Sequence, residues 1–177
     1  MRHSVDRRAR RAENGRLVPQ PETEMPQSDR HPPISPAVYY RDPRAALDWL
    51  ERAFGFVRGI AAYTPDGDVA HAELTYRGGV VRIGGRWTDF IATPADVDGR
   101  NTQSVHVQLA DGLDAHCEHA RAAGAEILQE PADQFYGDRT YRARDPEGHL
   151  WTFAQHVRDV TPEQAAAETG LRFERWS

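Results

Sequence analysis

The stretch Tyr136-Gly-Asp-Arg-Thr-Tyr-Arg-Ala-Arg-Asp-Pro-Glu-Gly-His-Leu-Trp-Thr-Phe153 determines the fold class more strongly than any other part of the chain. Within it, residues 145–148 have the pattern of a tight turn, because proline presets the backbone at the second position and glycine suits the fourth. The flanking segments are rich in Thr, Tyr, Trp and Phe, which favour a half-buried strand. The stretch therefore predicts a β-hairpin, and its second strand, residues 149–155, ends the compact part of the chain.

The composition indicates a soluble protein with one domain and polar tails. The chain has 177 residues, of which 39% are hydrophobic, and its mean hydropathy is −0.72. No apolar run approaches the roughly 20 residues that a membrane-spanning helix needs, and the N-terminus lacks the apolar core of a secretory signal. The single cysteine, Cys117, excludes an internal disulfide and fits a reducing cytoplasm, where we expect it to be an inert core residue.

The charge is divided unevenly along the chain. Residues 1–33 contain seven Arg and five acidic residues, whereas residues 34–177 contain 15 Arg and 22 acidic residues. The acidic body argues against a nucleic-acid surface. The proline-rich segment 1–33 has no hydrophobic periodicity and is predicted to be a disordered tail, although its small basic run at residues 7–11 could contact a partner.

The next part of the chain predicts a β-α-β-β-β module over residues 34–84. Asp42 is suited to cap a helix and Pro43 to begin it, apolar residues then recur at helical spacing, and Gly55 ends it. The expected strands are residues 34–40, 56–63, 69–76 and 80–84.

The same pattern returns over residues 102–156 after a linker, residues 85–101. An offset of 69 residues aligns the helix caps Asp42 and Asp111 and the helix-ending Gly55 and Gly124, which suggests an internal duplication. The expected strands are residues 103–109, 126–129, 140–144 and 149–155, with a helix between the first two. In the C-terminal extension, residues 157–177, Thr161 and Gln164 indicate a capping box for a short helix that Gly170 ends.

Two such modules and the closing Asp-Pro-Glu-Gly-His hairpin resemble the glyoxalase/bleomycin-resistance/extradiol-dioxygenase superfamily, which has the vicinal-oxygen-chelate fold. The resemblance covers residues 34–156 and is most specific at the hairpin and at residues 72–76. It implies an α+β fold in which two β-α-β-β-β modules form a curved mixed β-sheet cup around a ligand site. In this family the site lies within one chain or between the two chains of a homodimer, and we expect a homodimer.

The resemblance also implies where a metal would bind. Family members with a metal use four ligands, typically His or Gln, Glu, His and Glu, on the cup-facing sides of four strands. The matching positions here are Ser35, Glu73, Ser104 (or Val105, with a different loop alignment) and Thr152. Only Glu73 is a competent ligand, because hydroxyl groups bind Zn or Fe weakly. The expectation is therefore that no metal or other cofactor is bound.

Strand alternation leaves a second metal set open. His71 and Glu73 lie two apart on one strand and share a face. On residues 103–109 the apolar Val side chains should face the helix, so that His106 faces the cup. His71, Glu73 and His106 could then hold Fe, Mn, Ni or Zn as a two-histidine, one-carboxylate set. In the alternative, they are polar groups that line the cup. His149 is expected to face away from it and to have a structural role.

Further candidate ligand-binding residues follow from position. The resemblance places Ser35 and Thr152 on the cup side, and alternation from Ser35 implies that Tyr39 also faces the cup. On residues 103–109, alternation likewise directs Gln108 to the cup. Trp87 and Phe90 lie on the linker, where they form an apolar lid or simply pack the loop. The last two candidates, Tyr136 and Arg139, lie on the loop that enters the closing hairpin.

Three functions are compatible with these residues. The first is metal-free binding of a small organic molecule in the cup, as in drug sequestration or resistance. The second is an enzyme, a glyoxalase-type lyase/isomerase or an Fe(II) dioxygenase, with Glu73 as the metal ligand or general base. The third is a non-catalytic module that binds a partner through the tail and the C-terminal helix. The fold alone does not choose among them, and the first is the function that the substituted ligand positions favour.

Overall fold

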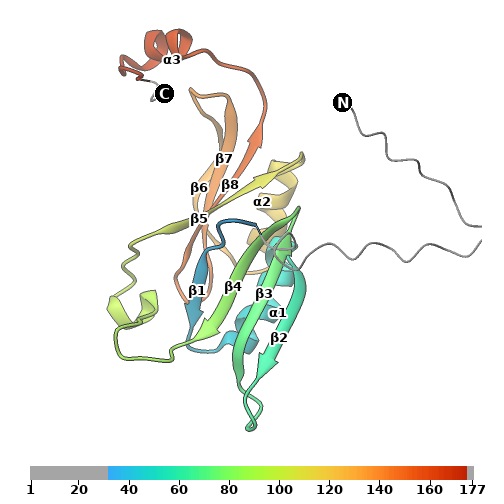
Figure 1. Cartoon of the computed structure of the whole chain (residues 1–177). Coiled ribbons are helices and arrows are strands. Elements are labelled where there is room, and N and C mark those ends of the chain that lie inside the picture. The colour runs from blue at the N-terminus through green and yellow to red at the C-terminus, as the bar shows by residue number, and fades with distance from the viewer. Residues whose placement is uncertain (1–31, 175–177) are drawn as a thin grey trace, which may run out of the picture. The chain divides into compact units, whose positions relative to one another are not determined.

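The computed structural model describes residues 32–174. Nearly all of the segment predicted to be disordered, residues 1–33, lies outside this range. Two four-stranded mixed sheets follow one another along the chain, each with one helix on one face (Figure 1). This confirms the predicted α+β fold with two β-α-β-β-β modules. Among residues 32–174, every helix is too short or too polar to span a bilayer.

Module one has the strand order β1-β4-β3-β2, with β1 parallel to β4 and the other pairs antiparallel. Its helix α1 begins and ends as the sequence predicts. The Asp42 carboxylate accepts the N–H of Ala45, and Gly55 ends the helix with a positive φ of 71°. The elements are β1 (Ala37–Tyr40), α1 (Pro43–Phe54), β2 (Val57–Tyr63), β3 (Val69–Tyr76) and β4 (Gly79–Gly85).

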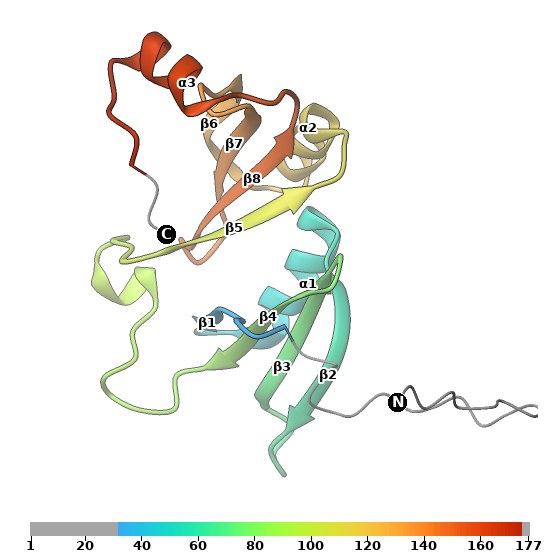
Figure 2. The same ribbon diagram turned by 45° about the horizontal axis from the view of Figure 1, so that its top comes forward.

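Module two repeats this topology in the order β5-β8-β7-β6 (Figure 2). The linker contains one turn of 3-10 helix, Pro94–Val97. The C-terminal helix α3 begins at the predicted capping box of Thr161 and Gln164. The elements are β5 (Ser104–Leu109), α2 (Leu113–Ala122), β6 (Glu126–Asp133), β7 (Asp138–Arg144), β8 (Leu150–His156) and α3 (Pro162–Thr169).

The predicted cap of α2 is wrong. Gly112, not Asp111, is the residue before the helix, and no side chain of its own caps it. Instead, the N–H of Leu113 donates to the side-chain oxygen of Gln155 in β8, at 3.0 Å. A contact from a strand 42 residues away therefore replaces the local cap that the sequence pattern indicated.

The two modules share one hydrophobic core. The helices α1 and α2 pack on each other between the sheets, and a single cluster of buried residues includes side chains from both modules. Phe54, at the end of α1, is 1% exposed, and its ring contacts Trp151 and Phe153 of β8 at centroid distances of 5.5 and 4.7 Å. Neither module therefore has a complete core of its own.

Carbonyl groups at the C-terminal end of each of the helices α1 and α2 accept hydrogen bonds from side chains of the other helix. Trp49 of α1 donates to the carbonyl of Ala123 at 2.9 Å, and His119 of α2 donates to the carbonyl of Arg52 at 2.7 Å. His116 donates through Nε2 to the carbonyl of Phe54 at 3.2 Å, so its Nδ1 accepts the Tyr141 hydroxyl at 2.6 Å. Burial lowers the pKa of His116, which agrees with a neutral ring in this position.

The closing turn, residues 145–148, joins module two to module one. The turn has the predicted hydrogen bond from Gly148 N–H to the Asp145 carbonyl at 3.0 Å. The Asp145 carboxylate is buried and accepts the Tyr40 hydroxyl at 2.7 Å and the Trp151 indole N–H at 3.0 Å. Burial, together with the Asp145 carboxylate, raises the pKa of Tyr40 well above its usual value.

The next turn residue continues this contact. The Glu147 carboxylate accepts the backbone N–H groups of Arg41 and Asp42, at 2.7 and 3.0 Å, just ahead of α1. The negative charge of a carboxylate at the N-terminus of a helix also interacts favourably with the helix dipole. The hairpin that marks the fold in the sequence is thus also the clamp between the two modules.

Candidate functional site

The cup face of module one is the side of its sheet opposite α1. Alternation along the strands places Val38, Ala72, Leu74 and Ile83 in the core, and it places their neighbours on the other side. In the register of the sheet, Ala37 of β1 pairs with Arg82 of β4, which pairs with Glu73 of β3. This cup face comprises Ala37, Tyr39, His71, Glu73 and Arg82.

Glu73 is the most buried charged group of this face, with 9% of its surface exposed. Its Oε1 lies 3.5 Å from Nε2 of His71 and 3.8 Å from Nε of Arg82. The predicted pairing of His71 and Glu73 on one face is therefore present, and Arg82 is a third member that the sequence analysis missed. The carboxylate can accept a hydrogen bond from a ligand or exchange a proton with the adjacent imidazole.

A pocket of about 240 Å³ opens on this cup face. Tyr39, His71, Arg82 and Trp87 supply its larger lining side chains. The Trp87 ring is 70% exposed and meets the Phe90 ring edge-on, with the centroids 5.6 Å apart. Trp87 thus borders the pocket, whereas Phe90, 80% exposed, projects into solvent. The lid of Trp87 and Phe90 over the cup stays a prediction.

The cup face of module two is the side of its sheet opposite α2. On β5, Val105, Val107 and Leu109 are buried and the residues between them are exposed, as predicted from alternation. Across the sheet, His106 pairs with Thr152 of β8, which pairs with Arg142 of β7. This cup face comprises Ser104, His106, Gln108, Arg142 and Thr152.

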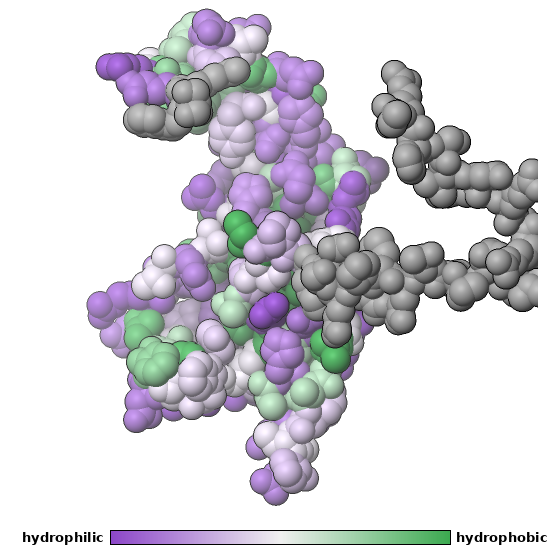
Figure 3. Space-filling view, in the orientation of Figure 1, coloured by the Kyte–Doolittle hydropathy of each residue, from purple (hydrophilic) through white to green (hydrophobic). Residues whose placement is uncertain are grey.

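His106 and Gln108 also line a second pocket, of about 380 Å³. Its opposite wall comes from module one, where Tyr76 and Val80 flank the β3–β4 turn. Surface colouring by hydropathy shows small apolar groups dispersed among polar ones on the visible face rather than one continuous apolar area (Figure 3). The candidate site is therefore a set of polar cup faces with adjoining pockets of modest size.

The predicted metal set is not assembled within one chain. Among the described residues, the only group of three or more His, Cys, Asp or Glu side chains with ligand atoms within 4.8 Å is Cys117, Glu118 and Glu130. His71 and Glu73 are close to each other, but His106 does not join them. The Ser35, Ser104 and Thr152 hydroxyls do not fit Zn or Fe either, because these metals prefer imidazole, thiolate and carboxylate.

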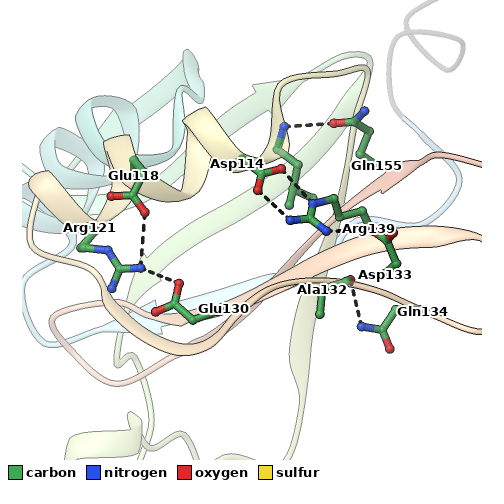
Figure 4. A network of polar contacts seen from close by, with 10 residues as sticks. Asp114, Glu118, Arg121, Glu130, Ala132, Asp133, Gln134, Arg139 and Gln155 are labelled. Carbon is green, nitrogen blue, oxygen red and sulfur yellow. Dashed lines mark hydrogen bonds and ion pairs between the residues drawn. The ribbon is translucent and has the colours of Figure 1, made fainter.

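The Cys117 group is part of the packing of α2 against β6. The thiol is fully buried, and burial raises its pKa to about 11, so it is not a thiolate ligand at neutral pH. The carboxylates of Glu118 and Glu130 both pair with Arg121, at 3.5 and 2.7 Å (Figure 4). This geometry agrees with the predicted core position of Cys117.

The structure places Arg139 on the helix side of its sheet, away from the cup. Its guanidinium lies 2.8 Å from Asp114 of α2 and 2.8 Å from Asp133 of β6 (Figure 4). These two partners occupy its donors, so the position does not support the predicted ligand contact. Tyr136 is 45% exposed at the β6–β7 turn, where its ring packs edge-on against Phe135.

His149 faces away from the cup face of module two, as predicted, and contacts module one. Its Nε2 lies 2.8 Å from the Tyr39 carbonyl, and its ring packs against Tyr40 at a centroid distance of 4.6 Å. This histidine therefore contributes to the contact between the modules.

The fold and the two polar cup faces define a protein of the two-module β-α-β-β-β class. The family model described as the Glyoxalase/Bleomycin resistance protein/Dioxygenase superfamily matches residues 34–153. The chain therefore belongs to this superfamily, as its resemblance predicts.

The chain is also similar to several individual proteins. An uncharacterized protein of Mycobacterium tuberculosis (strain ATCC 25618 / H37Rv) is 31% identical over 140 residues, which cover 77% of this chain and 81% of that protein. The crystal structure of TioX from Micromonospora sp. ML1 is 35% identical with a TM-score of 0.57, and the match covers 70% of this chain and 98% of TioX. A glyoxalase/bleomycin resistance protein/dioxygenase from Nocardioides shares the fold at 18% identity and a TM-score of 0.52, over 73% of this chain and 85% of that one.

Proposed function

We propose that the protein binds a small organic molecule in its cup without a resident metal, as a sequestering protein rather than a catalyst. The observation that carries this proposal is the donor set at the four expected ligand positions. Glu73 is a single strong ligand among three hydroxyls, and it already lies next to His71 and Arg82. A site with these groups recognises a ligand by hydrogen bonds and charge.

The side chains around Glu73 indicate the kind of ligand. Tyr39 and Trp87 offer aromatic surfaces beside the Arg82 guanidinium in one pocket. A guanidinium and aromatic rings together favour a planar ligand through stacking and paired hydrogen bonds. The ligand class that fits best is a planar or amphipathic aromatic compound.

The proposal includes a homodimer. Among the described residues of one chain, His106 does not join His71 and Glu73 in a metal-ligand group. A second copy would supply the opposite cup face to each module and would increase the area that contacts a ligand.

Binding of a planar aromatic compound should change the tryptophan fluorescence saturably, because Trp87 is exposed at the rim of the pocket. We expect a screen of planar natural products to yield such a compound, and Trp87→Phe to remove most of the signal. Phe173→Leu, an exposed aromatic residue that does not line the pocket, is the matched control and should leave the signal unchanged. Silence across a broad panel would contradict the proposed binding, and stoichiometric Fe, Mn, Ni or Zn in protein purified without chelators would contradict its metal-free character.

A second candidate function rests on the 3.5 Å contact between His71 and Glu73, which is a geometry suited to proton transfer. In a lyase or isomerase of the glyoxalase type, Glu73 would act as the general base. Turnover of the hemithioacetal of methylglyoxal and glutathione, or of catechols, with and without added metals tests this function. If it is correct, Glu73→Gln should lower kcat at least about 100-fold, whereas full activity in this variant would exclude Glu73 from the mechanism.

A further inference from the structure

Arg142 differs from the arginines beside it in having no acidic partner. Arg139 pairs with two aspartates, and Arg144 donates to Glu126 at 2.9 Å. Within residues 32–174, the Arg142 side chain makes no hydrogen bond or ion pair. It is exposed in the middle of β7, where a free guanidinium is available to a ligand.

The strand geometry directs Arg142 to the cup face. Tyr141 and Ala143, on either side of it, are fully buried against α2, so Arg142 lies on the opposite side of the sheet. Its direct cross-strand neighbour is Thr152, and the next residue in the same row is His106. Arg142 and Thr152 are directly opposed in an antiparallel pair, with Cβ atoms about 4.5–5.5 Å apart. His106 lies one further strand spacing away, about 4.8 Å, so the three side chains can reach one small ligand group.

A second arginine, Arg144, lies on the same side of this sheet. Arg144 is two residues from Arg142 on β7 and therefore shares its side of the sheet. Its Nε is buried and has no hydrogen-bond partner among the described residues. Because this N–H has almost no accessible surface, a ligand does not reach it, and Arg144 contributes positive charge rather than a hydrogen bond.

The internal repeat places opposite charges at matching positions of the two cup faces. The predicted offset of 69 residues maps Ala37 to His106 and Glu73 to Arg142, and the middle residues of the two rows, Arg82 and Thr152, differ by 70. The row Ala37, Arg82, Glu73 of module one thus corresponds to the row His106, Thr152, Arg142 of module two. One cup face carries a carboxylate where the other carries a guanidinium.

We propose that Arg142, Thr152 and His106 form an oxyanion site, so that the small molecule bound in the cup carries a carboxylate or a similar planar anionic group. The inference rests on the proposed function and specifies its ligand class. A guanidinium binds a carboxylate through two parallel N–H donors, and the Thr152 hydroxyl adds a third donor from the next strand. Thr152, at the position where the family has a metal-binding carboxylate, would then help to bind an anion.

Three planar isosteres of different charge test this site: benzoate, benzamide and benzamidine. Their binding to the full-length protein is measured by two-dimensional ¹H–¹⁵N NMR titration, in which the amides of β7 and β8 report the location. We expect benzoate to bind about tenfold more tightly than benzamide, since the charge strengthens the hydrogen bonds to the guanidinium. Arg142→Gln should remove this difference, and Arg142→Glu should reverse it so that benzamidine binds more tightly than benzoate.

The control is Arg52→Gln on α1, because Arg52 is also an exposed arginine without an ion pair among the described residues. This variant should retain the benzoate preference. Equal affinities of benzoate and benzamide at the cup, unaffected by Arg142→Gln, would overturn the oxyanion site and leave the proposed aromatic binding intact. No binding of any of the three compounds would count against both.

Discussion

Replacement of Asp145 by alanine should lower the free energy of unfolding by about 3–5 kcal/mol, since it leaves two buried donors unpaired at roughly 1–3 kcal/mol each. These donors are the Tyr40 hydroxyl and the Trp151 indole N–H, both of which lie in the core. The same carboxylate accepts the backbone N–H groups of Glu147 and His149, at 3.1 and 2.9 Å, so the turn itself also loses its internal bonds. Urea denaturation followed by circular dichroism measures the loss.

The matched control is Asp66→Ala, in the turn between β2 and β3. Asp66 is exposed, and no described residue makes a hydrogen bond to its side chain, so this variant should change the stability by less than about 0.5 kcal/mol. Asp145→Asn should give an intermediate loss, because its amide retains one acceptor oxygen. A loss below about 1 kcal/mol in Asp145→Ala would show that the closing turn does not clamp the modules.

Replacement of Phe54 by alanine should destabilise the protein by about 3–5 kcal/mol. Its ring lies at the meeting point of the modules and contacts Trp49 and Phe56 of module one as well as Trp151 and Phe153 of module two. Truncation would leave a cavity lined by these large rings, which cannot collapse easily around it. The transition in urea should nevertheless remain single, because both modules lose the same shared contact.

Phe90→Ala is the control for the same change of side chain. Phe90 is 80% exposed, and truncation there should cost less than about 0.5 kcal/mol. If Phe54→Ala instead produced two separate transitions, the modules would be independent folding units, contrary to the shared core.

The sequence predicts an element best when residues adjacent to it in the chain fix where it begins and ends. Asp42, Pro43 and Gly55 fix both ends of α1 through local hydrogen bonds and backbone preferences. The strand β6 was predicted to end at residue 129, but it continues to Asp133 through Pro131. It is an edge strand with two register shifts against β7, and a proline is tolerated there because the outer edge needs no ladder donor.

The candidate site was predictable only where strand alternation applies. Alternation and the family positions predict His71, Glu73, His106 and Thr152 on the cup faces. The sheet registers agree, because Glu73 pairs with the exposed Arg82 and His106 pairs with Thr152. The loop position of Arg139 suggests a ligand contact, but its spacing of two from the buried Tyr141 places it on the helix side. Arg142 was missed, but the 69-residue offset from Glu73 was a signal that could have found it.

Contacts between distant segments were outside the reach of the sequence. The turn at residues 145–148 was recognisable, yet its bond to Tyr40 spans 105 positions, and no local pattern encodes such a pair. The same reason explains the unpredicted reach of Gln155 to α2.

The clamp by the closing turn has a consequence for the order in which the protein becomes native during translation. Module one is synthesised first, but Glu147 and Asp145, which bind its residues Arg41 and Tyr40, follow 106 and 105 positions later. At roughly 5–20 residues per second, the ribosome needs about 5–20 s to supply them. During that interval the nascent first module lacks the Glu147 carboxylate ahead of α1 and the Asp145 carboxylate that pairs with the buried Tyr40. Module one therefore reaches its native contacts only after the closing turn of module two has been synthesised.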